Sequence, residues 1–118
     1  MSSNNKILWP YGPADQPAPA FAAVISIDVF DNRTIVDMPP LTGACTVDLV
    51  ISGEIRNGAE IFLNVDQDAA GRNVTLGDGF LGDNLVGVAN DKDTIHAIYN
   101  EADGAFRVVS NHKTVDAA

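Results

Sequence analysis

Two aspartates in the middle of the chain have the spacing of calcium ligands. In the stretch from Asp66 to Gly71, carboxylates at the first and third positions precede a glycine at the sixth, as at the start of an EF-hand loop. The fifth position, Ala70, has no side-chain oxygen, and the twelfth is Gly77 instead of a bidentate glutamate. A turn explains the segment more simply, because aspartate accepts hydrogen bonds from backbone N–H groups and glycine supplies positive φ. The sequence therefore predicts a turn here, with no metal ion or other cofactor.

A second group of carboxylates lies in and after a glycine-rich stretch. Asp78 and Asp83 are within this stretch, and Asp91 and Asp93 follow it. The four side chains could converge on a divalent cation if the stretch folds over, since Ca²⁺ prefers oxygen ligands. Carboxylates in turns are mostly solvated, so we expect exposed turn residues instead.

Groups for nucleophilic catalysis are few. The chain has two histidines, His96 and His112, and one cysteine, Cys45. A nucleophile needs a base within hydrogen-bond reach, and no motif places Cys45 or a serine beside His96. The apolar surroundings of Cys45 favour a core residue over a nucleophile, and a lone cysteine forms no disulfide within the chain. A carboxylate pair of the glycosidase type depends on separation in space and stays open at this point. We predict a protein that is not an enzyme.

The composition favours one acidic domain. A chain of 118 residues fits a single domain, and an apolar fraction of 46% is enough for a core. Sixteen Asp and Glu against seven Lys and Arg give a net charge of −9, and the basic residues are not clustered. Phosphate backbones and anionic membranes attract grouped cations, so we expect neither nucleic acid nor a membrane as a partner.

The first twenty residues differ from the rest and predict an extended arm. Four of the six prolines lie in residues 1–20, and proline fixes φ and withholds a donor, which excludes a helix or a central strand. The arm carries four bulky residues that we interpret as partner-binding: Ile7, Leu8, Trp9 and Tyr11. They need a surface to cover, either the chain's own body or a neighbouring subunit, where aromatic anchors contribute most. These residues lack the basic start and following apolar run of a signal peptide, so we predict none.

After the arm, alternating residues predict strands. Apolar and polar side chains alternate over residues 25–29 and 46–52, which is the period of a half-buried strand. Residues 34–37 form a short strand ended by Pro39-Pro40. Val50 breaks the outer polarity of its strand and predicts a second buried face.

Two turns predict consecutive hairpins. Asn57-Gly58 suits a type I′ turn, which needs positive φ at both central positions, and would pair residues 46–52 with residues 59–66. The turn at residues 67–71 would then pair the second of these strands with residues 73–76. No helical stripe interrupts this pattern, because Gly or Pro breaks every candidate.

A third hairpin completes the predicted fold. Asp103-Gly104 would join residues 94–100 to residues 105–110. Seven or eight short strands at this spacing are typical of an all-β protein, here an antiparallel β-sandwich or barrel-like module. We assign the β-domain to residues 21–111 and a short tail to residues 112–118.

The glycine-rich stretch, residues 77–87, predicts a long loop with an apolar tip. The tip holds two further partner-binding candidates, Phe80 and Leu81. Loops of this length are usually functional or mobile.

The segment from Asn57 to Leu76 resembles a module of tailed-bacteriophage virion proteins. In those proteins an Asn-Gly turn, an alternating strand, a Gln-Asp pair, a glycine and a Val-Thr-Leu segment are followed by a Gly-Phe loop. A strand pair ending in aromatic-Val-Val-Ser comes next. Here Gly79-Phe80, residues 93–99 and Phe106-Arg-Val-Val-Ser110 fill those places, so the match covers about residues 43–110.

The resemblance implies a virion accessory protein, either a capsid decoration protein or a head-fibre component. Such proteins are commonly homotrimers, bind the major capsid or another virion protein, and assemble in the cytoplasm of the bacterial host. The arm with Trp9 would lie along a capsid surface or a neighbouring subunit. The chain has no room for a long shaft or an enlarged tip, so receptor binding by this chain alone is in doubt. The alternative is a carbohydrate- or receptor-binding virion appendage that uses the loop, Phe80 and Tyr99.

Overall fold

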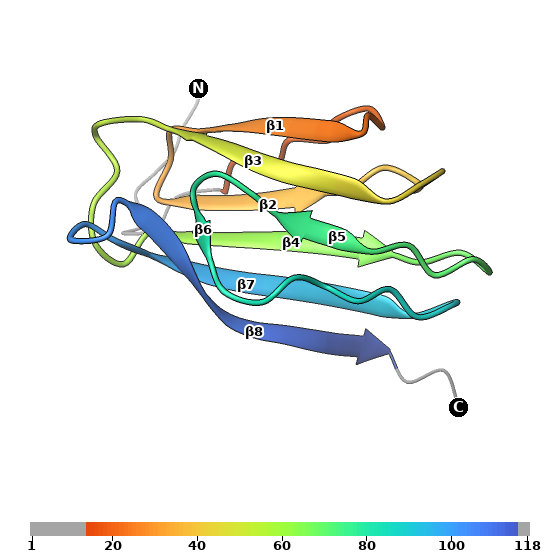
Figure 1. Ribbon diagram of the computed structural model, residues 1–118. Coiled ribbons are helices and arrows are strands. Elements are labelled where there is room, and N and C mark those ends of the chain that lie inside the picture. The colour runs from red at the N-terminus through yellow and green to blue at the C-terminus, as the bar shows by residue number, and fades with distance from the viewer. Residues whose placement is uncertain (1–13, 116–118) are drawn as a thin grey trace, which may run out of the picture.

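The computed structural model describes residues 14–115, with side chains up to Ser110, and this part of the chain contains eight strands and no helix. The all-β prediction is confirmed. The strands are β1 (Val24–Val29), β2 (Arg33–Asp37), β3 (Cys45–Ile51), β4 (Glu60–Asp66), β5 (Val74–Leu76), β6 (Phe80–Leu81), β7 (Lys92–Asn100) and β8 (Ala105–Val115). They form a three-stranded sheet, β1-β3-β5, and a five-stranded sheet, β2-β4-β7-β8-β6, which lie face to face (Figure 1).

Successive strands from β1 to β5 alternate between the two sheets. Among these five strands, neighbours in one sheet are therefore two apart along the chain and run in the same direction. Accordingly β1 pairs with β3, β3 with β5 and β2 with β4 in parallel, and β6 also pairs with β8 in parallel. The prediction of an antiparallel module is wrong for these pairs; it holds for β4 with β7 and for β7 with β8.

The predicted hairpins divide in the same way. Gly58 has a positive φ of 89° but Asn57 does not, so the predicted type I′ turn is wrong. The strands β3 and β4 lie in different sheets, so the Asn57-Gly58 turn carries the chain across the sandwich. The predicted pairing of β4 with β5 is wrong for the same reason. The last hairpin is confirmed, because β7 and β8 pair antiparallel across a turn in which Gly104 N–H donates to the Asn100 carbonyl at 3.0 Å.

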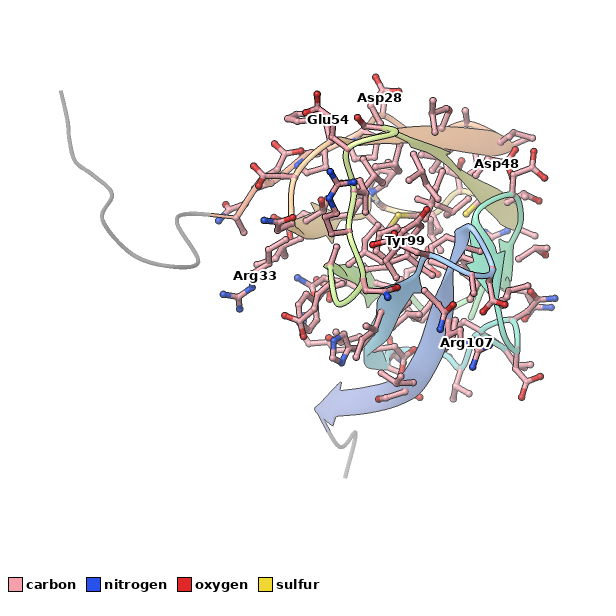
Figure 2. All side chains as sticks on the ribbon, turned by 90° about the vertical axis from the view of Figure 1, so that its left-hand side faces the viewer. Asp28, Arg33, Asp48, Glu54, Tyr99 and Arg107 are labelled. Atoms are coloured by element: carbon pink, nitrogen blue, oxygen red, sulfur yellow. The ribbon has the colours of Figure 1, made fainter. Side chains whose placement is uncertain are left out.

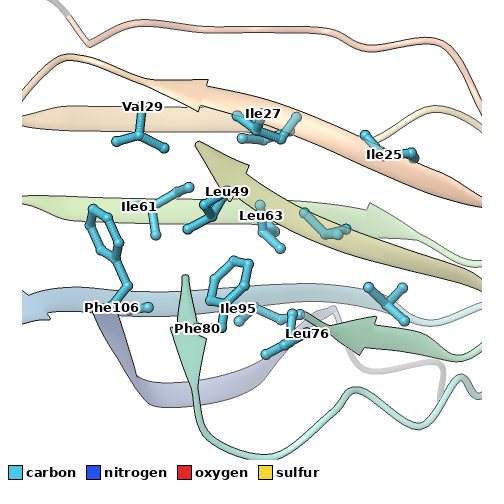
Figure 3. Close-up of a cluster of buried hydrophobic side chains, with 14 of the residues drawn as sticks. Ile25, Ile27, Val29, Leu49, Ile61, Leu63, Leu76, Phe80, Ile95 and Phe106 are labelled. Carbon is cyan, nitrogen blue, oxygen red and sulfur yellow. The ribbon is translucent and has the colours of Figure 1, made fainter. Parts of the chain in front are cut away.

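The core lies between the sheets and follows the two-residue period. In β1, Ile25, Ile27 and Val29 point inward while the residues between them are exposed. In β4, Ile61 and Leu63 point inward from the opposite sheet, and Figure 3 shows the two sets facing each other. Full burial of one such side chain contributes about 1.5–3 kcal/mol. The second buried face predicted at Val50 is wrong: this side chain is 57% exposed on the outside of the three-stranded sheet.

The domain boundaries shift slightly from those predicted. Strand β8 extends to Val115, four residues beyond the predicted boundary at residue 111. At the other end, the last part of the predicted arm runs along β2 and hydrogen bonds to it. Asp15 N–H donates to the Arg33 carbonyl at 3.0 Å, and Asp37 N–H donates to the Pro17 carbonyl at 3.2 Å.

Two connections that are distant in sequence pack backbone against backbone. The turn after β4 receives a hydrogen bond from Asn90 N–H to the Asp68 carbonyl at 2.8 Å, and Gln67 N–H donates to the Asp91 carbonyl at 2.8 Å. Gly87 lies so close to Arg72 that a Cβ atom at that position would overlap the Arg72 backbone. A glycine is therefore required there for lack of space.

Candidate functional site

The outward-pointing side chains of the five-stranded sheet form the candidate functional site, which we call the outer face. Paired residues on neighbouring strands share one face of a sheet, so the register arranges these side chains in rows across the strands. One row crosses all five strands: Arg33, Glu60, Ile98, Arg107 and Leu81. The next row contains Ile35, Phe62, His96 and Ser110.

The second row contains a stack of rings. The rings of Phe62 and His96 are parallel within 9°, and their centroids are 4.3 Å apart. The Arg33 guanidinium carbon lies 5.8 Å from the centroid of Phe62, within the range of a cation–π contact. His96 Nε2 is 3.0 Å from a Glu60 carboxylate oxygen. The imidazole is thus held by a ring and a carboxylate, and these contacts fix the geometry of the middle of the outer face.

The long row combines charged and apolar side chains. Leu81 is 47% exposed, although it is a large apolar residue. Beside it, the Arg107 side chain donates to the Asp103 carboxylate, and this hydrogen bond and the negative charge raise the pKa of Arg107. Both signs of charge and two aliphatic side chains therefore lie along one line at one end of the sheet.

The opposite end of the outer face is polar. Thr94 Oγ1 donates to the Asn64 amide oxygen at 3.1 Å, and Asn64 Nδ2 donates to the Asp37 carboxylate at 3.2 Å. Lys92 and Asp66 form an exposed salt bridge of 3.2 Å. Such exposed pairs contribute about 0–1 kcal/mol, so their main effect is to order the side chains.

The three-stranded sheet has a different outer surface. Asp28 and Asp48 belong to it and lie in the upper part of Figure 2, whereas Arg33 and Arg107 of the five-stranded sheet lie lower, at the left and at the right. The remaining outward residues of the three-stranded sheet are Val24, Ser26, Thr46, Val50 and Thr75. Its outer surface therefore carries acidic charge without basic residues, whereas the outer face of the five-stranded sheet combines both signs with an aromatic stack.

The two partner-binding candidates in the glycine-rich loop are separated by the structure. Both belong to the short strand β6, so they point to opposite sides. Phe80 is 7% exposed and packs in the core, which corrects its interpretation as a contact residue. Leu81 lies on the outer face. The ring of Tyr99 packs against that of Phe106 at 5.1 Å and is partly buried, so it supports the core more than it offers a contact surface.

The four candidates in the arm, Ile7, Leu8, Trp9 and Tyr11, lie outside the described residues. Their proposed role in binding a partner stays a prediction.

The calcium-like turn is held together by its own polar groups, as turn chemistry predicts. The Asp68 carboxylate accepts from Ala70 N–H at 2.8 Å, and Gly71 has a φ of 67°. The Gln67 side chain donates to the Arg72 carbonyl at 2.8 Å and accepts from Arg72 N–H at 2.7 Å. The intervening glutamine therefore closes the turn.

The second acidic group differs from the prediction in its exposure. Asp91 and Asp93 are buried, 2% and 7% exposed, so they are not solvated turn residues. Asp78 and Asp83 stay outside the buried set. In residues 14–115 no group of three or more His, Cys, Asp or Glu side chains is arranged to hold a metal ion.

The predicted core position of Cys45 is confirmed. Its side chain is buried beside the other core residues of β3, and burial raises the pKa of its thiol. The side chain of His112 lies beyond those that the structure describes.

Sequence reasoning missed Arg33, Glu60 and Phe62 as parts of the site. Phe62 carries a signal in hindsight, because a large aromatic residue occupies a polar position of an alternating strand. Arg33 and Glu60 carry none, since only the parallel pairing of β2 with β4 makes them neighbours.

No family model, curated protein or solved structure matches this chain. Among the described residues, no helix is long and apolar enough to cross a membrane.

Proposed function

We propose that this chain is a non-enzymatic structural component of a bacteriophage virion, which decorates the capsid or forms part of a head fibre as a homotrimer. It assembles in the cytoplasm of the bacterial host. Its partners are other copies of the chain and the major capsid protein or another virion protein. The outer face of the five-stranded sheet is the contact surface.

The long row of the outer face is the observation that carries this proposal. Arg33, Glu60 and Arg107 place charges of both signs across the sheet, with exposed Leu81 at the end of the row. Protein interfaces combine an apolar centre with polar groups and are enriched in arginine and aromatic residues. A surface of this composition, with charges of both signs beside exposed apolar side chains, suits contact with another protein surface.

The ring stack supports the same conclusion through its rigidity. Phe62 is held between His96 and Arg33, and His96 is held in turn by Glu60. A side chain that is already ordered loses less conformational entropy on binding. The pairing of His96 with a ring and a carboxylate gives it a structural role in the site.

The homotrimer and the virion location are supported by the sequence resemblance to phage virion modules. The strand pair that the resemblance places at the end of the module coincides with the β7–β8 hairpin. The receptor-binding alternative loses support, because Phe80 is a core residue.

The test compares two exposed apolar residues on opposite sides of the molecule. Leu81→Glu changes the outer face, and Val50→Glu changes the outer surface of the three-stranded sheet, where the valine is similarly exposed. We expect light scattering to give a trimer for the unmodified chain and for Val50→Glu, and a smaller species for Leu81→Glu. As a control for folding, the thermal unfolding of each variant is compared with that of the unmodified chain, with each sample taken as a monomeric fraction at the same concentration.

A strict monomer of the unmodified chain at micromolar concentration, without binding to capsids, would refute the proposed function. Loss of the trimer in Val50→Glu but not in Leu81→Glu would keep the assembly and reject the outer face as its contact surface.

A further inference from the structure

The turn between β3 and β4 is held against the turn between β7 and β8 by a reciprocal pair of hydrogen bonds. Asn57 N–H donates to the Glu101 carboxylate at 3.0 Å, and Glu101 N–H donates to the Asn57 side-chain oxygen Oδ1. Each side chain thus accepts from the backbone of the other residue. We call this pair the clasp. Both residues are exposed, so water reaches the clasp freely.

The clasp contains the one Asn-Gly sequence in the chain. Glycine has no Cβ, so its backbone nitrogen can reach the side-chain amide carbon of a preceding asparagine with little hindrance. Attack of the Gly58 nitrogen on Asn57 Cγ forms the C–N bond of a succinimide ring. The bond from Cγ to the side-chain nitrogen breaks, and this nitrogen leaves as ammonia with the Gly58 amide proton. Water then opens the ring at either carbonyl and leaves aspartate or isoaspartate at position 57.

The folded chain opposes this reaction at both reacting groups. Gly58 N–H donates to the Tyr99 carbonyl at 3.1 Å, so the proton that must leave is engaged and the nitrogen is oriented toward β7. The Asn57 amide is bound through Oδ1 by Glu101 N–H, which directs it toward a different residue. Tyr99 N–H donates in turn to the Ala59 carbonyl at 2.8 Å, so the backbone after Gly58 is also fixed.

We propose that Asn57 is a self-modification site of this protein and that the clasp gates its reaction. While the clasp is closed, Asn57 remains an amide. When the turn opens locally, Gly58 attacks and Asn57 deamidates. Local opening of an exposed turn costs much less free energy than global unfolding, so the reaction proceeds in the folded protein. The substrate is the chain itself, and water is the other reactant.

The product does not restore the clasp in its original form. Deamidation replaces the neutral amide of Asn57 with a carboxylate next to that of Glu101, and two carboxylates in one site disfavour each other. The isoaspartate product also lengthens the backbone between residues 57 and 58, which displaces Gly58 from the Tyr99 carbonyl. The modification is therefore one-way, and it loosens the attachment of the β3–β4 crossover to β7.

Two substitutions of Glu101 in the full-length chain test the gate. Glu101→Ala removes the acceptor of Asn57 N–H, whereas Glu101→Gln keeps an oxygen at that position and removes the same charge. Peptide mass spectrometry measures the rate of deamidation at Asn57 in mildly alkaline buffer. We expect Glu101→Ala to react at least about twofold faster than the unmodified chain, the low end for the loss of one hydrogen bond, and Glu101→Gln to react at the unmodified rate.

Urea separates local from global opening. In urea that unfolds the chain, all three hydrogen bonds of Asn57 and Gly58 are lost, so the reaction should be at least about tenfold faster than in the folded chain. At low urea concentrations the rate should stay nearly constant, because local opening exposes little surface. A rate that rises steeply, in step with the free energy of global unfolding, would overturn the local gate.

Other outcomes would also overturn the proposal. An equal or slower rate in Glu101→Ala would show that the clasp does not protect Asn57, and an equal acceleration in Glu101→Gln would assign the effect to charge. A urea-unfolded chain that stays unmodified at Asn57 would reject the site itself.

Asn57→Asp tests the consequence of the reaction. We expect faster amide hydrogen exchange at Gly58 than in the unmodified chain, while the amides that pair β7 with β8 keep their protection. Unchanged exchange at Gly58 would show that the added charge leaves the clasp closed. None of these outcomes depends on the proposed virion role.

Discussion

The close approach of Gly87 to Arg72 gives a stability prediction with built-in controls. We predict that Gly87→Ala strongly destabilises the protein, because the new methyl group overlaps the backbone N, C and O atoms of Arg72. That backbone cannot withdraw easily, since the Gln67 side chain binds both the N–H and the carbonyl of Arg72. The substitution therefore tests whether the turn after β4 and the loop before β7 are locked together.

The size of the effect follows from the kind of overlap. Overpacking a well-packed region costs about 1–3 kcal/mol, and a clash with fixed backbone belongs at the upper end of that range. A loss of about 3 kcal/mol is a large part of the total stability of a domain, about 5–15 kcal/mol. At about 4 °C per kcal/mol for a domain of this size, the melting temperature should fall by about 12 °C.

Two other glycines separate the clash from ordinary glycine effects. Gly53 has no atom within 4 Å of an added Cβ and no positive φ, so Gly53→Ala should change stability by less than about 0.5 kcal/mol. Gly58 also has open space but a φ of 89°, so Gly58→Ala should cost about 1 kcal/mol from backbone conformation alone. Thermal and urea unfolding of the three variants measure the series. If Gly87→Ala melts together with Gly53→Ala, the two segments are not in contact and the reasoning is wrong.

Three further predictions concern the interior. Gln67→Leu should lower the free energy of unfolding by about 3 kcal/mol in urea titrations, because it leaves the N–H and carbonyl of Arg72 without their partner. A loss of stability no larger than that of a typical surface substitution would contradict this. Phe106→Ala, at a position with no exposed surface, should cost about 3–5 kcal/mol in the same assay, and a small loss would mean that the site is not packed as described. Burial raises the pKa of the Cys45 thiol above its ordinary value of 9.0, so the neutral thiol stabilises the fold fully below that pH. Above it the unfolded chain loses the proton first and stability falls, and the decline should be shallower in Cys45→Ala, as pH-dependent melting can measure.

The strands and their inward residues were predictable because the two-residue period reports burial directly. Ile25, Ile27 and Val29 face the core as the alternation indicates. The pairing was not predictable by the same means, since an alternating strand fits either sheet. Asn57-Gly58 does form a turn, but a turn does not determine which sheet the next strand joins. The eight residues from Ser52 to Ala59 are enough to cross the sandwich.

The candidate site was predictable only where it is local in sequence. Leu81 and Phe80 are adjacent, and the sequence indicated that this apolar pair matters without separating the exposed residue from the buried one. The short strand β6 separates them. The stack of Phe62 on His96 depends on the pairing of β4 with β7. These strands are not consecutive in the chain: β5, in the other sheet, and β6, at the far edge of the same sheet, come between them.

The alternation of strands between the sheets also sets an order for folding. β1 finds its partner in β3, and β2 finds its partner in β4, only after a full winding of intervening chain has been fixed. Closing such loops costs entropy before any contact repays it, so these parallel pairs form slowly. The β7–β8 hairpin needs only the turn after Asn100 and can form within microseconds. In refolding of the full chain we therefore expect the parallel pairs of the N-terminal strands to form after the β7–β8 hairpin, although those strands come first in the sequence.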